Sequence, residues 1–166
     1  MKKKLLYGIP GLIILIFFDQ FTKFLATKYL KGLPDGKDVI KNILKIQYLE
    51  NKGAAFGLLQ DKFVFFYIFT ILFLFLFTFL YIKMPSDRRF CPINILLIFF
   101  LAGAIGNLID RLRFKYVVDF IYVSIINFPI FNVADIYVTC SCFVFLFLIV
   151  FYYKEQDLAK IKLIKR

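Results

Sequence analysis

Residues 63–82 read FVFFYIFTILFLFLFTFLYI, twenty consecutive positions without a charged side chain. An α-helix rises 1.5 Å per residue, so a segment of this length covers the roughly 30 Å of hydrocarbon in a bilayer. Phe and Leu dominate, and apolar residues do not alternate with polar ones, which favours a transmembrane helix over a barrel strand. The segment therefore predicts that the chain crosses a membrane.

Three more apolar segments lie on either side of this one, at about 5–30, 93–112 and 136–153. The whole chain is 61% hydrophobic, compared with roughly 45–50% in soluble domains. We expect an all-α membrane protein, a single domain over 1–166 with four transmembrane helices.

The stretch between the first two predicted helices, about 32–61, is too long for a plain connection. Residues 39–49 are rich in β-branched side chains and roughly alternate, which predicts one or two strands. Residues 51–57 are small and read as a flexible segment. We expect a small sheet, a β-cradle, on the outer membrane surface between the first and second helices.

The formal net charge of +11 does not indicate a nucleic-acid partner, because the sequence contains no nucleic-acid-binding motif. In a membrane protein, basic residues usually flank the cytoplasmic ends of helices and contact anionic lipid. The 22 basic residues divide evenly between the two sides. Those near the termini and in the loop at 83–92 form dense clusters with few carboxylates, so we expect both termini in the cytoplasm.

Elimination narrows the possible chemistry. The absence of histidine excludes Ser–His–Asp and Cys–His nucleophiles and His-ligated zinc. No phosphate-binding glycine motif is present, and we expect no metal and no cofactor. Cys91, Cys140 and Cys142 lie in or beside apolar segments, so we interpret them as small buried residues away from any site. Carboxylates remain as the acid–base groups.

Two carboxylates differ from the others. Asp119 follows the third apolar segment and Asp135 opens the fourth, so antiparallel neighbouring helices would bring both to the same membrane face. Apolar neighbours would raise the pKa of each, and two such carboxyls can form an acid–base dyad. By contrast, Asp19 has Lys23 at i+4 and Asp110 abuts Arg111, which indicates structural ion pairs.

Other interpretations stay open at this level. Each aspartate could be a buried structural residue, or the two could be relay sites of a small proton-coupled carrier. A structural scaffold packed through Gly103 and Gly106 is a third hypothesis. Asn132 lies three residues before Asp135, where it could cap the fourth helix.

Five blocks, in order, resemble the bacterial lipoprotein signal peptidase (signal peptidase II) family. They are Asp19–Lys23, Asn51–Gly57, Gly103–Arg111, Val117–Phe120 and Phe128–Asp135.

The resemblance implies an aspartyl endopeptidase of the bacterial inner membrane with its site at the extracytoplasmic face. Its catalytic pair would be Asp119 and Asp135. The supporting residues that it implies are Asp19, Asn51, Gly103, Asn107, Arg111 and Asn132. The implied substrate is a prolipoprotein that carries diacylglyceryl on a cysteine, cleaved just before that cysteine. The partners implied are this substrate, membrane lipid and globomycin-type inhibitors.

Overall fold

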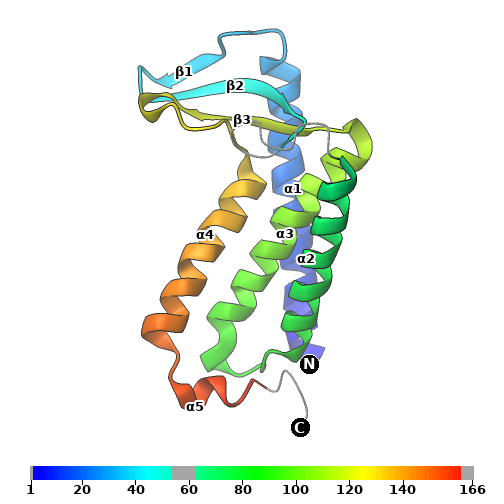
Figure 1. The fold of residues 1–166 in the computed structure, drawn as a ribbon, viewed down its shortest axis with the longest axis vertical. Helices are drawn as coiled ribbons and strands as arrows, with labels where there is room; N and C mark the ends of the chain where they lie inside the picture. The colour runs from blue at the N-terminus through cyan, green and yellow to red at the C-terminus, as the bar shows by residue number, and fades with distance from the viewer. Residues whose placement is uncertain (1, 54–62, 162–166) are drawn as a thin grey trace.

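The computed structural model describes residues 2–53 and 63–161. Four long helices run side by side, with a small sheet across one end of the bundle (Figure 1). The helices are α1 (Lys2–Leu30), α2 (Phe63–Lys83), α3 (Cys91–Phe114) and α4 (Val133–Phe147). Shorter pieces are η2 (Arg88–Phe90), η3 (Ser124–Ile126), the π-helical η4 (Leu148–Tyr152) and α5 (Glu155–Leu158).

All four long helices are long and apolar enough to cross a membrane, with mean hydropathies from 1.7 to 2.5. Many large apolar side chains on their outer faces are exposed, such as Phe17 on α1 and Phe75 on α2. Such faces suit lipid, because hydrocarbon does not penalise them as water does. The expected fold class, four membrane-capable helices with a small sheet, is confirmed.

The third helix is central and packs against α1, α2 and α4. Its close approach to two neighbours depends on glycines. A Cβ at Gly103 would lie 2.6 Å from Ala134 O of α4, and one at Gly106 would lie 2.5 Å from Asp19 Oδ2 of α1. Small residues at these positions let the helix backbones approach each other, as is common in membrane bundles.

The sheet is antiparallel in the order β1 (Lys37–Ile40), β2 (Leu44–Asn51) and β3 (Val117–Val123). The first two strands come from the expected stretch. The third comes from the segment between α3 and α4, so the sheet joins two parts of the chain that sequence reasoning had kept separate. The expected flexible segment lies outside the described residues from Ala54 onward.

The pairing of β2 with β3 places polar residues at the bundle end of the sheet. Leu49 pairs with Asp119, and Asn51 pairs with Val117. The chain enters β3 through Lys115, whose left-handed backbone (φ 67°) ends α3 and whose N–H donates to Arg111 O at 3.1 Å. This reversal directs β3 back over the helices, with Val117, Val118 and Asp119 all buried.

Candidate active site

Asp119 lies on β3 and is only 1% exposed. Both of its carboxyl oxygens accept amide hydrogen bonds: Asn132 Nδ2 donates to Oδ1 at 2.6 Å and Asn51 Nδ2 donates to Oδ2 at 2.8 Å. The pKa of Asp119 is raised to about 7, chiefly because burial disfavours the charged form and also because Asp135 is a nearby negative charge. The two amide hydrogen bonds act in the opposite direction.

Asp135 is the third residue of α4 and is fixed by the start of that helix. Asn132 caps the helix as expected: its side chain accepts from Asp135 N at 3.0 Å, and Asn132 N donates to Asp135 Oδ2 at 3.1 Å. This reciprocal arrangement is a capping box. The second carboxyl oxygen, Oδ1, accepts from Asn107 Nδ2 of α3 at 2.9 Å.

The amides also link the two carboxyls to each other. Asn132 Nδ2 donates to Asn107 Oδ1 at 3.1 Å, in addition to its bond to Asp119. One continuous network therefore runs from Asn51 through Asp119, Asn132 and Asn107 to Asp135. The three asparagines come from β2, α3 and the N-cap of α4. The positions of both carboxyls therefore depend on how these three elements pack at this end of the bundle.

A buried cation supports this network from behind. Lys23 of α1 is 3% exposed, and its ammonium lies 3.0 Å from Asp19 Oδ2 and 3.1 Å from Asp110 Oδ2. It also donates to Asn107 Oδ1 at 2.8 Å. The expected ion pair of Asp19 with Lys23 is confirmed. The expected pairing of Asp110 with Arg111 is wrong, because the partner of Asp110 comes from another helix.

The two carboxylates that flank Lys23 hold backbone positions next to the candidate dyad. Asp110 Oδ2 accepts from Val118 N at 3.0 Å, one residue before Asp119. Asp19 Oδ1 accepts from Ala134 N at 2.9 Å, one residue before Asp135. A single buried lysine thus connects the anchors of both aspartates.

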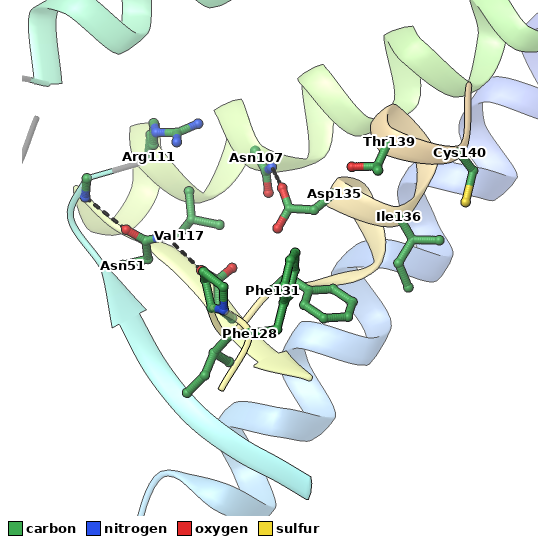
Figure 2. A pocket seen from close by; sticks show the side chains of 14 residues that line it. Asn51, Asn107, Arg111, Val117, Phe128, Phe131, Asp135, Ile136, Thr139 and Cys140 are labelled. Atoms are coloured by element: carbon green, nitrogen blue, oxygen red, sulfur yellow. Dashed lines mark hydrogen bonds between the residues drawn. The ribbon is translucent and has the colours of Figure 1, made fainter. Parts of the chain in front are cut away.

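A pocket of about 390 Å³ opens over the carboxyls. Polar residues on its wall include Asn51, Asn107, Arg111, Asp119 and Asp135, and apolar ones include Phe128, Phe131 and Ile136 (Figure 2). A second hollow of about 230 Å³ shares four lining residues with it: Asn107, Arg111, Asp135 and Thr139. It continues between α2 and α4 past Phe69, Phe73 and Gly103. Asp135 therefore borders two apolar hollows.

Arg111 brings a cation to this pocket. Its guanidinium lies 4.7 Å from the Phe66 ring centroid, and its carbonyl oxygen accepts from Tyr67 Oη at 2.8 Å. Both contacts join the end of α3 to the start of α2. Arg111 is thereby held beside the carboxyls rather than paired with Asp110.

The structure gathers all eight sequence-predicted site residues at one end of the bundle. Five line the pocket, Asn132 lies buried beneath it, and Asp19 and Gly103 pack behind it. Sequence reasoning missed Lys23, Gln20 and Asp110 as parts of the same network. Gln20 Nε2 donates to Asp110 Oδ1 at 2.9 Å and to Gly106 O at 3.1 Å. The i,i+4 spacing of Asp19 and Lys23 predicted their ion pair. It could not indicate that Lys23 also contacts Asp110 and Asn107 of α3.

The interpretation of the cysteines needs correction. Cys91, Cys140 and Cys142 are exposed on the helix surface rather than buried, and Cys140 lines the pocket that holds the two aspartates. Their apolar neighbours in sequence had suggested burial, but these cysteines lie on the outward faces of the helices. Within the described ranges 2–53 and 63–161, no three His, Cys, Asp or Glu residues are arranged to hold a metal ion.

The fold is shared with solved membrane enzymes. Two structures described as bacterial membrane enzymes match with TM-scores of 0.79 and 0.76, each 33% identical to this chain. The first match covers 89% of this chain and 92% of the other, and the second covers 88% and 94%. Together with four membrane-capable helices, these matches define a multi-pass bacterial membrane enzyme.

Sequence comparison identifies the family. The model of signal peptidase (SPase) II matches residues 12–151. A lipoprotein signal peptidase of Caldanaerobacter subterraneus subsp. tengcongensis is 44% identical over 82% of this chain and 90% of its own length. One from Streptococcus pyogenes serotype M5 is 38% identical over 95% and 98%. The chain belongs to the signal peptidase II family and is a peptidase, which leaves the carrier and scaffold hypotheses without support.

Proposed function

We propose that the chain is an aspartyl endopeptidase in which Asp119 and Asp135 activate a water molecule. The observation that carries this proposal is the pair of carboxyls on one pocket wall, linked to each other through the amides of Asn132 and Asn107. The pKa of Asp119, raised to about 7, supports it, because a buried carboxyl of this kind still binds a proton close to neutral pH, as the acid of a dyad must.

The proposed mechanism uses one ionised and one protonated carboxyl. The ionised carboxylate takes a proton from water as the water oxygen attacks the scissile carbonyl carbon. The protonated carboxyl donates its proton to the carbonyl oxygen, which gives a tetrahedral diol. The C–N bond then breaks, and the leaving nitrogen receives a proton from the dyad. The two carboxyls titrate as a pair, so the proton is assigned to the pair and not to one of the two aspartates.

Asparagine amides and Arg111 would orient the reacting groups. Asn51, Asn107 and Asn132 fix the directions of the carboxyl lone pairs, so little reorganisation is needed during the reaction. The Arg111 guanidinium borders the same pocket and supplies donors for peptide carbonyl oxygens. Gly103 contributes space, because a side chain there would displace α4 and Asp135 with it.

The proposed substrate is a prolipoprotein with diacylglyceryl on its cysteine, cleaved just before that cysteine to release the signal peptide. The relatives are named lipoprotein signal peptidases. The apolar wall formed by Phe128, Phe131 and Ile136 and the hollow lined by Phe69 and Phe73 suit acyl chains beside the carboxyls. Globomycin-type inhibitors would occupy the same pocket.

We further propose that the sheet and the site face the outside of the cytoplasmic membrane, with both termini in the cytoplasm. The start of α1 and the short α5 lie at the opposite end of the bundle from the sheet (Figure 1). Dense basic clusters at that end favour a cytoplasmic location.

The direct test replaces each aspartate separately by asparagine. An amide can neither take nor release the required proton, so Asp119→Asn and Asp135→Asn should each reduce cleavage at least about 10²-fold. Cleavage of a diacylglyceryl-modified prolipoprotein is followed by the shift on a gel, with membrane insertion and melting temperature measured in parallel.

Asp35→Asn is the matched control, because Asp35 is an exposed carboxylate in the turn before β1. It should retain the parent's activity. Near-normal turnover by a well-inserted Asp119→Asn or Asp135→Asn protein would contradict the dyad.

A further inference from the structure

A larger groove lies at the other end of the molecule. It has a volume of about 760 Å³ and runs between α1, α3 and the segment that joins α2 to α3. It shares no lining residue with the pocket of Asp119 and Asp135. Its size is within the range of small-molecule sites, and the proposed function gives it no role.

The inner part of this groove is apolar and opens toward the bilayer. Ile14 and Leu15 of α1 face Ile98 and Phe99 of α3 across it. The space beside Gly11 is open, since a Cβ at that position would meet nothing within 4 Å. From Lys4 to Leu15 the helix rises about 16 Å, roughly the depth of one leaflet. The apolar part of the groove is therefore long enough to hold most of one extended acyl chain.

The rim of the groove carries two cations and one anion. Lys4 Nζ donates to Met84 O at 3.0 Å and to Tyr81 O, which leaves one of its three N–H donors. The side chain of Arg88 is exposed and makes no hydrogen bond within the part of the chain that the structure describes. With the carboxylate of Asp87, the rim carries one net positive charge. A phosphodiester carries one negative charge and fits that balance.

Asn94, which lines the groove, has an acceptor behind the groove wall that is unpaired among the described residues. Asn94 of α3 is 8% exposed, and its Nδ2 donates to Pro85 O at 2.8 Å. Its Oδ1 is buried and has no hydrogen-bond partner among residues 2–53 and 63–161. A buried acceptor without a partner carries a free-energy cost. Relief of this cost by a headgroup hydroxyl requires the amide to rotate until Oδ1 reaches the groove.

We infer that this groove binds one anionic glycerophospholipid of the phosphatidylglycerol type. Its phosphate lies between Lys4 and Arg88, its headgroup hydroxyls face Asp87 and Asn94, and one acyl chain follows the apolar wall between α1 and α3. The site is independent of peptide cleavage, because it lies at the end of the bundle away from the sheet. A lipid bound there would lie in one leaflet and contact both α1 and α3.

The chain has no tryptophan, so one introduced indole can report the lipid next to a single position. Tyr7 lines the groove and is 75% exposed, whereas Ile82 is 54% exposed near the same end of α2 and lies outside it. Full-length Tyr7→Trp and Ile82→Trp proteins are reconstituted in phosphatidylcholine vesicles. Brominated phosphatidylglycerol, phosphatidylcholine or phosphatidylethanolamine then quenches the fluorescence.

At the Tyr7→Trp position, we expect phosphatidylglycerol to be preferred over phosphatidylcholine by roughly fivefold, the effect of about one basic residue near the surface. The Ile82→Trp protein should show a preference below about twofold. Equal quenching by both lipids at the Tyr7→Trp position would overturn the inference. Stronger binding of phosphatidylethanolamine would also overturn it, because that lipid is zwitterionic.

Second substitutions in the Tyr7→Trp background separate a built site from diffuse surface charge. Arg88→Gln should reduce the preference to below about twofold, whereas Lys83→Gln, the same charge change at the same end but outside the groove, should leave it unchanged. Gly11→Leu should abolish it by filling the open passage. Each variant must first show the parent's melting temperature in phosphatidylcholine. An equal loss from Lys83→Gln, or none from Gly11→Leu, would refute the site.

Discussion

Lys23 shows how much of this site depends on residues that never reach the pocket. Its ammonium contacts Asp19, Asp110 and Asn107, and those three groups in turn hold Ala134 N, Val118 N and Asp135. A buried charge is tolerable only with partners of this quality. The cluster therefore fixes both candidate carboxyls from behind, without contacting substrate.

The role of Asp110 can be separated from that of the dyad. Asp110→Asn should lower the melting temperature, because it weakens the ion pair with Lys23 and changes the acceptor for Val118 N. Loss of one partner of a buried pair costs about 3–5 kcal/mol when the other charge stays uncompensated, and Asp19 remains here to reduce that cost. We expect reduced stability with residual cleavage, measured by thermal unfolding and by the gel assay. An inactive Asp110→Asn protein beside an active Asp119→Asn protein would mean that the wrong carboxyl was chosen.

The pKa of Asp119 predicts a dependence of stability on pH. Because the folded-state pKa is raised to about 7 from 3.8, the folded protein binds a proton that the unfolded chain has released between those values. The contribution is fully present below about pH 4 and is lost as pH rises through 7. Asp119→Asn removes this titration. The melting temperature of the variant minus that of the parent should therefore increase between pH 4 and pH 8.

Cleavage should follow the same titration. If the raised pKa belongs to the acid of the pair, kcat/KM of the parent should fall on the alkaline side of about pH 7. A melting-temperature difference that is flat across this range, together with full activity at pH 9, would contradict a protonated Asp119.

At the scale of helices, glycines set the distance between α3 and its neighbours. Gly103→Ala should displace α4, because a Cβ there would lie 2.6 Å from Ala134 O and 2.7 Å from Val138 Cγ2. Overpacking of this kind costs about 1–3 kcal/mol. We expect a lower melting temperature and reduced cleavage, since Asp135 lies in the first turn of α4.

Gly11→Ala is the control for this substitution, because a Cβ at Gly11 meets no atom within 4 Å. Alanine is also the better helix former at an interior position, so this variant should be at least as stable as the parent. Equal behaviour of the two variants would show that the α3–α4 contact tolerates a methyl group.

At the scale of the whole molecule, the candidate site lies where the helix bundle meets the sheet, because Asp119 is on β3 and Asp135 is in the first turn of α4. Figure 1 shows the sheet across this end of the bundle. A soluble peptide has little tendency to stay at such a boundary, whereas each buried CH₂ contributes about 0.8 kcal/mol to membrane binding. The hollow between α2 and α4 adjoins Asp135, so a lipid-anchored substrate would be held beside the carboxyls. Under the proposed function, this arrangement would make the lipid part of substrate recognition.

Cleavage should consequently require the diacylglyceryl group. Matched prolipoprotein peptides with and without this thioether are compared in the same bilayer at equal concentration. We expect kcat/KM to be at least about 10²-fold higher for the lipidated peptide, given the free energy of burying two acyl chains. Equal values would leave a general membrane aspartyl protease and would remove the lipid from the recognition step.

Much of this protein could be predicted from local sequence. A charge-free run of about twenty residues has few alternatives to a membrane helix, because only an intrasegment hydrogen-bond pattern satisfies the backbone in hydrocarbon. Asp119 and Asp135 could be selected as candidate acid–base groups because apolar neighbours surround them. The ion pair of Asp19 with Lys23 and the cap by Asn132 were predictable because both are local, at spacings of four and three residues.

The rest was decided only by tertiary packing. Local spacing could not show that β3 joins the sheet, since its partner β2 lies about seventy residues earlier in the chain. Nor could it reveal that Lys23, not Arg111, is the partner of Asp110, because contacts between helices depend on their rotation and on the glycines that let them approach. The cysteines were misjudged for a related reason: in a membrane, apolar surroundings in sequence do not distinguish the lipid-facing side of a helix from the packed side.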